Sequence, residues 1–136
     1  MGKANAAAGF QPTLDNRSGV PVYRQLIDQV LTAIASGTLT AGAQLPTVRQ
    51  MAVDLAINPN TVMRAYRELE IRGILNTQQG SGTYITDQKV KEGEAQRRRR
   101  VSQMVGELVA RAGAEGFSLD ELLEVLHDLQ DEKKRR

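Results

Sequence analysis

Residues 46–73 read PTVRQMAVDLAINPNTVMRAYRELEIRG, and their pattern predicts two short helices joined by a tight turn. Apolar residues in each half recur at i, i+3, i+4 and i+7, the spacing of a helix that buries one face. They are Val48, Met51, Ala52 and Leu55 in the first half and Val62, Ala65, Tyr66 and Leu69 in the second. Thr47 and Asn58 suit the N-caps of the two helices. Pro59 suits the first helical position, where a backbone N–H has no partner inside the helix.

The flanking segments predict a longer helix before this pair and a hairpin after it. The upstream apolar residues again have helical spacing, and they are Tyr23, Leu26, Ile27, Val30, Leu31 and Ile34. Residues 39–46 read as a short extended piece. Downstream, ILNT at 74–77 and TYIT at 83–86 are rich in β-forming residues, and the loop QQGSG separates them. The order helix, helix-turn-helix, hairpin predicts a winged helix-turn-helix.

The third helix of this arrangement turns a polar face away from the predicted core. At 100° per residue, Asn60, Arg64 and Arg67 lie on that face, and Thr61 lies on its flank. In a major groove, Asn pairs with adenine and Arg with guanine, and the first residues of a recognition helix contact base edges. The same arginines also fit an ordinary solvated helix face. Ile71 falls on the outward side as well, and we expect it to pack on the hairpin.

Two further places are candidate DNA contacts. Arg49 lies early in the second helix, from which an arginine reaches a phosphate or a base. Gly80 and Gly82 flank Ser81 and leave little bulk at the hairpin tip, which suits a minor groove or a phosphate. Taken alone, the same tip fits an ordinary hairpin turn. A winged helix that binds only proteins would carry an apolar outward face, which Asn60, Arg64 and Arg67 do not provide.

The composition of the chain excludes several classes of function. The chain has 136 residues, with 40% hydrophobic and 25% charged, which are the proportions of a folded domain. Its net charge is only +2, so a DNA-binding argument depends on where the charges lie. With no Cys and one His, His127, which reads as a surface residue, the sequence predicts no metal site and no cofactor. It shows no catalytic residues, no membrane span and no signal peptide, which predicts a cytoplasmic protein that is not an enzyme.

The C-terminal region predicts two more amphipathic helices, separated near Gly113 and Gly116, and the second begins with the capping box Ser118-Leu-Asp-Glu121. Their apolar stripes predict a dimer in which two helices from each chain form a four-helix arrangement. The stripe residues are Val101, Met104, Val105, Leu108, Leu119, Leu122, Leu123 and Leu126. The alternative is that both helices fold back on the same chain. The run Arg97–Arg100 fits DNA phosphates, a solvated face, or ion pairs with Glu92 and Glu94.

The sequence therefore predicts a mainly α protein in three parts. Residues 1–9 are a flexible leader, residues 10–86 a winged helix-turn-helix DNA-binding domain, and residues 87–136 a short two-helix dimerisation appendage.

Residues 21–85 resemble the DNA-binding domain of the GntR family of bacterial transcription regulators. The matching signatures are PVYRQLIDQV, GAQLPTVRQMAVDLAINPNTVMRAYRELEIRGIL and GSGTYI. The stretch FQPTLDNRSGVPVYRQL, together with NPNTV followed by RAYRELE, is most similar to the YtrA-like subgroup.

This resemblance implies a cytoplasmic repressor that binds an inverted-repeat operator on double-stranded DNA as a homodimer. It implies DNA contacts at positions that match Arg49, Asn58, Asn60, Thr61, Arg64, Gly80 and Gly82. It also implies a short dimerisation appendage like that of the YtrA-like subgroup, and control of a neighbouring transporter operon. A small-molecule effector is compatible with the sequence, but no residue identifies one.

Overall fold

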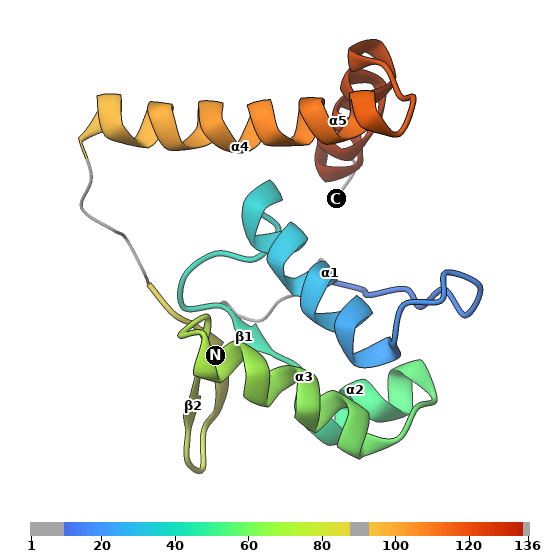
Figure 1. The fold of residues 1–136 in the computed structure, drawn as a ribbon. Helices are drawn as coiled ribbons and strands as arrows, with labels where there is room; N and C mark the ends of the chain where they lie inside the picture. The colour runs from blue at the N-terminus through green and yellow to red at the C-terminus, as the bar shows by residue number, and fades with distance from the viewer. Residues whose placement is uncertain (1–9, 88–92, 135–136) are drawn as a thin grey trace. The chain divides into compact units, whose positions relative to one another are not determined.

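The computed structural model describes residues 10–87 and 93–134. The predicted leader, residues 1–9, lies outside the described residues. The chain separates into two compact units, with the division between residues 88 and 89. Among the described residues, the first unit contains three helices and three short strands, and the second contains two helices (Figure 1). The prediction of a mainly α fold is thus confirmed.

The first unit has the predicted order of elements. Its helices are α1 (Val22–Ser36), α2 (Val48–Leu55) and α3 (Pro59–Ile71). Its strands are β1 (Gln44–Leu45), β2 (Leu75–Gln78) and β3 (Gly82–Ile85). The helix α3 packs against both α1 and α2, and the β2–β3 hairpin follows its C-terminal end (Figure 1). This is the winged helix-turn-helix that the sequence predicts.

The helix boundaries follow from local capping. Thr47 begins α2, because its hydroxyl accepts a hydrogen bond from Gln50 N at 3.0 Å. Asn58 begins α3, because its Oδ1 accepts from Asn60 N at 2.8 Å, with Pro59 at the first helical position. The turn between them places Ala56 in the left-handed region with φ 55°. The two caps and this turn set the angle between α2 and α3.

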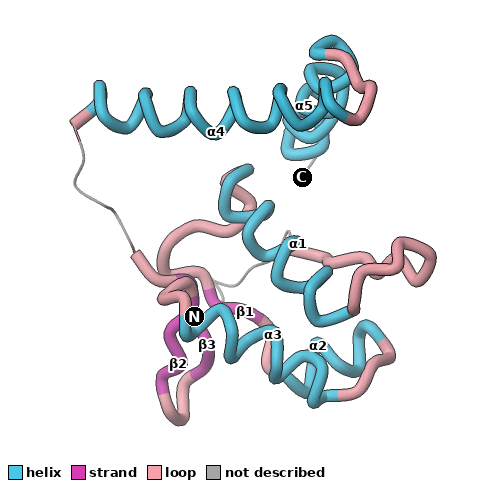
Figure 2. The backbone as a smooth tube through the Cα atoms, viewed as in Figure 1, coloured by secondary structure: helices cyan, strands magenta, loops and turns pink. Residues whose placement is uncertain are grey.

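The sheet contains one strand that the sequence does not predict. The order is β1-β3-β2 and both pairings are antiparallel (Figure 2). In the β1–β3 pairing, Gln44 lies opposite Tyr84 and Leu45 opposite Thr83. The extended piece predicted at 39–46 thus becomes an edge strand that joins the hairpin to the segment before α2. A strand of two residues carries too little pattern to predict its partner.

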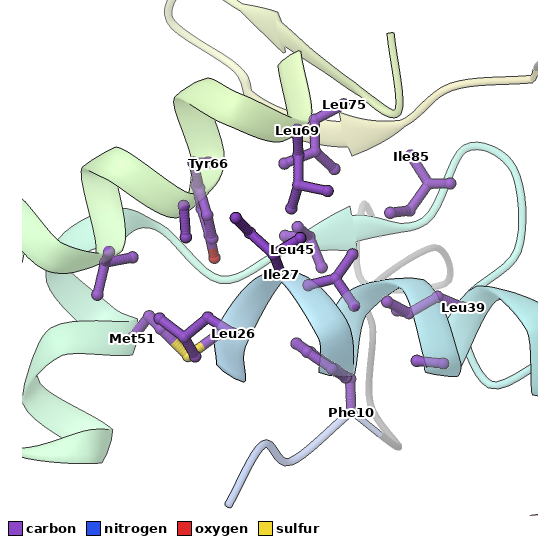
Figure 3. Packing of buried hydrophobic residues seen from close by; sticks show 14 of the residues in the cluster. Phe10, Leu26, Ile27, Leu39, Leu45, Met51, Tyr66, Leu69, Leu75 and Ile85 are labelled. Atoms are coloured by element: carbon purple, nitrogen blue, oxygen red, sulfur yellow. The ribbon is translucent and has the colours of Figure 1, made fainter. Parts of the chain in front are cut away.

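The core of the first unit draws on every helix and strand (Figure 3). The predicted inward residues of α2 and α3 are buried, except Val48 and Leu55, which are partly buried. Tyr66 is buried and its hydroxyl donates to Pro46 O at 2.7 Å. Burial raises the pKa of Tyr66 above its ordinary range, so the phenol stays neutral. Ile71, by contrast, is 79% exposed, so the expectation that it packs on the hairpin is wrong.

The segment before α1 is fastened to that helix. Phe10 is buried in the core (Figure 3). Two glutamines of α1 bind the backbone that follows it. Gln29 Nε2 donates to Thr13 O at 2.7 Å, and its Oε1 accepts from Thr13 N at the same distance. Gln25 Nε2 donates to Asp15 O at 2.9 Å. The N-terminal segment thus belongs to the folded first unit from residue 10.

The second unit is a pair of helices, α4 (Glu94–Ala114) and α5 (Leu119–Lys134). Gly113 lies inside α4, so the predicted break begins later than expected, whereas Gly116 lies in the turn with φ 88°. The capping box is confirmed: Ser118 Oγ accepts from Glu121 N at 3.1 Å, and Glu121 Oε2 accepts from Ser118 N at 3.0 Å. Across the described residues, no helix has both the length and the apolar character needed to cross a membrane.

Candidate nucleic-acid interface

The outward face of α3 brings several predicted residues together around one shallow hollow. Asn60, Arg64 and Arg67 line it together with Met63, and its volume is about 150 Å³. Met63 is 45% exposed and is absent from the sequence-based candidates, because an apolar residue on a polar face gives no signal for base contact. Thr61 is partly buried beside this face. The helix thus presents donors, acceptors and one apolar side chain to the same ligand.

Asn58 differs from the other predicted DNA-contacting residues of α3, because its side chain already accepts a hydrogen bond within the protein. Its Oδ1 caps α3 through Asn60 N, which leaves the two N–H groups of its side-chain amide available. Asn58 and Asn60 are both exposed, and the backbone N–H groups at a helix start favour an anion such as phosphate. The start of α3 therefore combines capping with an outward polar surface.

The charges on α3 are distributed in a way that favours an anionic partner. Arg64 stacks on an aromatic ring of α1, with its Cζ 3.8 Å from the centroid of Tyr23. Arg72, near the end of the helix, pairs with Glu68 at 3.8 Å between Nη2 and Oε1. Neither Arg64 nor Arg67 forms an ion pair with a carboxylate among the residues that the structure describes. Both positive charges thus remain available on the outward face.

Arg49 lies on the neighbouring helix. It is the second residue of α2 and is exposed. At this position the first turn of α2 directs backbone N–H groups outward, which adds to the positive charge of the guanidinium. Its position thus suits a phosphate contact beside the face of α3.

The hairpin tip has a shape that glycine makes possible. Gly80 has φ 81° and Gly82 has φ 148°, which are backbone conformations that favour glycine. A Cβ at position 82 would lie 2.5 Å from Gln44 Nε2, which itself donates to Ser81 O at 3.3 Å. Ser81 Oγ is within 2.6 Å of the Tyr84 hydroxyl. The tip is therefore narrow and is held by β1 from one side.

The base of the hairpin is fastened to the end of α3. Thr77 Oγ1 donates to Glu70 Oε1 at 2.7 Å, and Thr86 Oγ1 donates to Gly73 O at 2.5 Å. These hydrogen bonds fix the hairpin relative to the outward face of α3. The two candidate DNA-contacting surfaces thus belong to one rigid arrangement within the first unit.

The second unit exposes most of its predicted apolar stripe. On α4, Val101, Met104, Val105 and Leu108 are exposed; on α5, Leu119, Leu123 and Leu126 are exposed and Leu122 is partly buried. Their contact with each other buries only Ala112 among the hydrophobic residues of the two helices. Phe117, Val125 and Leu129 extend this apolar surface. The two helices alone therefore do not cover their own stripes.

Other parts of the chain offer little additional chemistry. Residues 97–100 lie exposed near the start of α4, and Glu92, one of their predicted partners, lies outside the described residues. Within 10–87 and 93–134, no group of three or more acidic, His or Cys side chains is placed to hold a metal ion.

Comparison with known proteins agrees with this geometry. The family model described as "Bacterial regulatory proteins, gntR family" matches residues 22–85. The HTH-type transcriptional repressor YtrA of Bacillus subtilis is 33% identical over 121 residues, which cover 89% of this chain and 93% of that protein. Two further curated relatives match at 41% and 44% identity, but the match spans only 63% and 60% of their lengths.

Solved structures give the same result. A GntR family transcriptional regulator from Listeria monocytogenes has a TM-score of 0.59 and 30% identity, covering 85% of this chain and 98% of that one. YtrA from Sulfolobus acidocaldarius, a GntR-family transcription factor, has a TM-score of 0.52 and 29% identity, covering 88% of this chain and 97% of that one. The relatives are transcription regulators and not enzymes. The chain therefore belongs to the GntR family of bacterial regulatory proteins, as a YtrA-like DNA-binding transcription regulator.

Proposed function

We propose that this chain represses transcription in the cytoplasm by binding an inverted-repeat operator as a homodimer. The observation that carries the proposal is the outward face of α3, where Asn60, Met63, Arg64 and Arg67 surround one hollow. An exposed face with two arginines that no described carboxylate pairs suits DNA. The repressing action is proposed from the similarity to YtrA of Bacillus subtilis, which is named as a repressor.

The outward face of α3 supplies groups for each kind of base contact. Asn60 and Thr61, near the helix start, suit base edges at the floor of a major groove. Arg64 and Arg67 suit guanine, whose O6 and N7 accept two hydrogen bonds from one guanidinium. Met63 lines the same hollow and suits the methyl group of thymine. The helix therefore has the chemistry to select a sequence.

Residues around this helix suit the DNA backbone. Arg49 and Asn58, both exposed near helix starts, are proposed to bind phosphates and set the register of the protein on the duplex. The tip at Gly80, Ser81 and Gly82 is proposed to enter the adjacent minor groove, because it is narrow and held in place by Gln44. These contacts add affinity with little selection of sequence.

Dimerisation is proposed to use α4 and α5. Seven of the eight predicted stripe residues are exposed and Leu122 is partly buried. Covering a Leu side chain stabilises by about 1.5–3 kcal/mol. Several such residues offset an association cost of about 4–15 kcal/mol. A two-fold dimer also matches an inverted repeat, because protein symmetry mirrors the symmetry of the site. Control of a neighbouring transporter operon is proposed from the family resemblance alone, and no residue identifies a small-molecule effector.

Selection from a randomised DNA library tests the proposal. The purified full chain is mixed with duplexes that contain a random central region, and bound DNA is sequenced after several rounds. We expect two copies of one half-site in inverted orientation, centred about one helical turn apart or a multiple of it. Enrichment of no sequence, or of a single half-site without its inverted copy, would contradict the proposal.

A further inference from the structure

Arg64 has a contact that no sequence pattern reveals. Its guanidinium carbon lies 3.8 Å from the ring centroid of Tyr23, the second residue of α1. The sequence assigns Tyr23 to the apolar stripe of α1, and the structure confirms that it packs against the core while remaining partly exposed. The Tyr23 ring thus packs against the core and also stacks with an arginine of α3.

We propose that Tyr23 is a positioning residue for Arg64, and that it sets the sequence preference at one operator base pair without contacting DNA. The inference rests on the proposed function, because it needs Arg64 to read a base. It adds a residue of α1 to the determinants of specificity, although α1 is otherwise a core helix.

The stack holds the arginine without blocking it. A guanidinium that lies over an aromatic face uses its own face for that contact, and its N–H groups point outward in its plane. Those N–H groups are the ones that guanine O6 and N7 bind. An ion pair with a carboxylate would also hold the side chain, but it would occupy the N–H groups and cancel the charge. No carboxylate in the described parts of the chain pairs with Arg64.

Holding the side chain in advance increases selectivity. A free arginine samples many rotamers and loses that freedom when it binds, whereas a stacked arginine has already lost most of it. A stacked arginine also holds its guanidinium N–H groups in one direction. A base pair without acceptors in that direction therefore forms few hydrogen bonds with it. The stack thus favours the correct base pair more than the others.

Tyr23 is itself well anchored. Pro21 precedes α1 as its N-cap residue, and the Gln25 side chain holds the incoming segment through Val20 O at 2.8 Å and Asp15 O at 2.9 Å. The first turn of α1, which carries Tyr23, is therefore tied to the segment that precedes it. A ring held this firmly can fix the position of a side chain from another helix.

The experiment measures binding of the full chain to the selected operator and to operator variants with each base pair changed in turn. The variants are Arg64→Ala, Tyr23→Leu, Tyr23→Met, Tyr23→Phe and the double variant Tyr23→Leu with Arg64→Ala. Leu and Met keep apolar bulk but remove the aromatic face, and two such variants guard against one that fails to fold. Leu31→Ala is the matched control, since Leu31 is also a partly buried core residue of α1, two turns further along.

We expect Arg64→Ala to lose discrimination at one base pair of each half-site. Tyr23→Leu and Tyr23→Met should lose about two- to five-fold in discrimination at that same pair, the size of an exposed cation–π contact. Tyr23→Phe should retain it, because its ring is intact. The double variant should match Arg64→Ala alone, and Leu31→Ala should lower thermal stability without changing the preference.

Two outcomes separate this inference from the proposed function. If Arg64→Ala loses discrimination while Tyr23→Leu and Tyr23→Met keep it or bind more tightly, Tyr23 does not position Arg64, and the reading role of Arg64 stands. If Arg64→Ala keeps full discrimination at every base pair, both the inference and the proposed role of Arg64 are overturned.

Discussion

The hydroxyl of Tyr66 in α3 donates a hydrogen bond of 2.7 Å to Pro46 O, in the segment directly before α2. This bond lies in the core and joins α3, the proposed recognition helix, to the start of α2. Tyr66→Phe would remove the donor and leave the carbonyl of Pro46 without it. We expect a loss of about 1–3 kcal/mol in the free energy of unfolding, measured by urea titration. Tyr84→Phe, which alters an exposed hydroxyl, is the control and should change stability much less.

The same phenol predicts a dependence on alkaline pH. Because burial raises the pKa of Tyr66 in the folded state, its contribution to stability is complete below the unfolded tyrosine pKa of about 10 and is lost as the pH rises above it. In that range the unfolded chain has already released the proton that the folded chain retains. The wild type should therefore lose stability more steeply than Tyr66→Phe above about pH 10. If the stabilities of the two proteins fall in parallel as the pH rises, the phenol of Tyr66 has the same pKa in the folded and the unfolded chain, and the prediction is wrong.

Arg64→Ala should weaken operator binding by about 1–3 kcal/mol if Arg64 contacts a base. The matched control is Arg72→Ala, which removes an arginine from the end of the same helix that is paired with Glu68. The control should change affinity little and leave sequence preference intact. Fluorescence anisotropy with the selected operator and its single-base variants measures both effects. If the two variants have equal affinity and equal sequence preference, Arg64 does not contact a base.

Met63 gives a prediction that can be tested on the DNA itself. Replacing thymine by deoxyuridine removes only the methyl group, and the loss of one such apolar contact is worth about 0.8 kcal/mol. We expect one thymine of each half-site to show this loss with the wild type and to show none with Met63→Ala. If the Met63→Ala protein is just as sensitive to the substitution, another residue makes the methyl contact.

Gly82→Ala should destabilise the hairpin more than Gly80→Ala. Both residues have positive φ, which costs a residue with a Cβ about 1–2 kcal/mol. At position 82 the new Cβ would also lie 2.5 Å from Gln44 Nε2, whereas position 80 has no atom within 4 Å. Thermal unfolding compares the two variants. Adding Gln44→Ala should recover part of the loss for Gly82→Ala, and a failure to do so would show that backbone strain alone is responsible.

Leu108→Glu and Leu126→Glu should dissociate the proposed dimer, because each places a charge in an apolar stripe that the proposed interface would cover. Gln103→Glu, a charge at an exposed polar position of α4, is the control. Sedimentation equilibrium should show monomers for the two leucine variants and dimers for the control and the wild type. If all of these proteins are dimers, the interface does not involve the stripes of α4 and α5. If the wild type is a monomer, the proposed dimerisation is wrong.

Features determined by nearby residues were predictable from the sequence. The caps at Thr47, Asn58 and Ser118 depend on residues two or three positions away, so their side chains and spacing suffice to predict them. The helical stripes are predictable for the same reason.

Features that depend on how helices and strands pack were not predictable. The pairing of β1 with β3 joins Leu45 to Thr83, and the stack of Tyr23 on Arg64 joins α1 to α3. Met63 was missed because a helical wheel shows where a side chain points but not which apolar side chain serves a ligand. Ile71 was expected to pack because it is apolar, yet it is 79% exposed.

The pairing of β1 with β3 also bears on how the protein is made. It closes a loop of residues 46–82, which contains all of α2 and α3. Closing a loop of this length costs entropy that is recovered only when both ends are present, so the two helices and the hairpin should form in one cooperative step. During synthesis, the hairpin can therefore take its place beside α3 only after residue 85 has left the ribosome. A nascent chain that has emerged only as far as α3 should therefore bind the operator more weakly than the complete chain, because it lacks the hairpin.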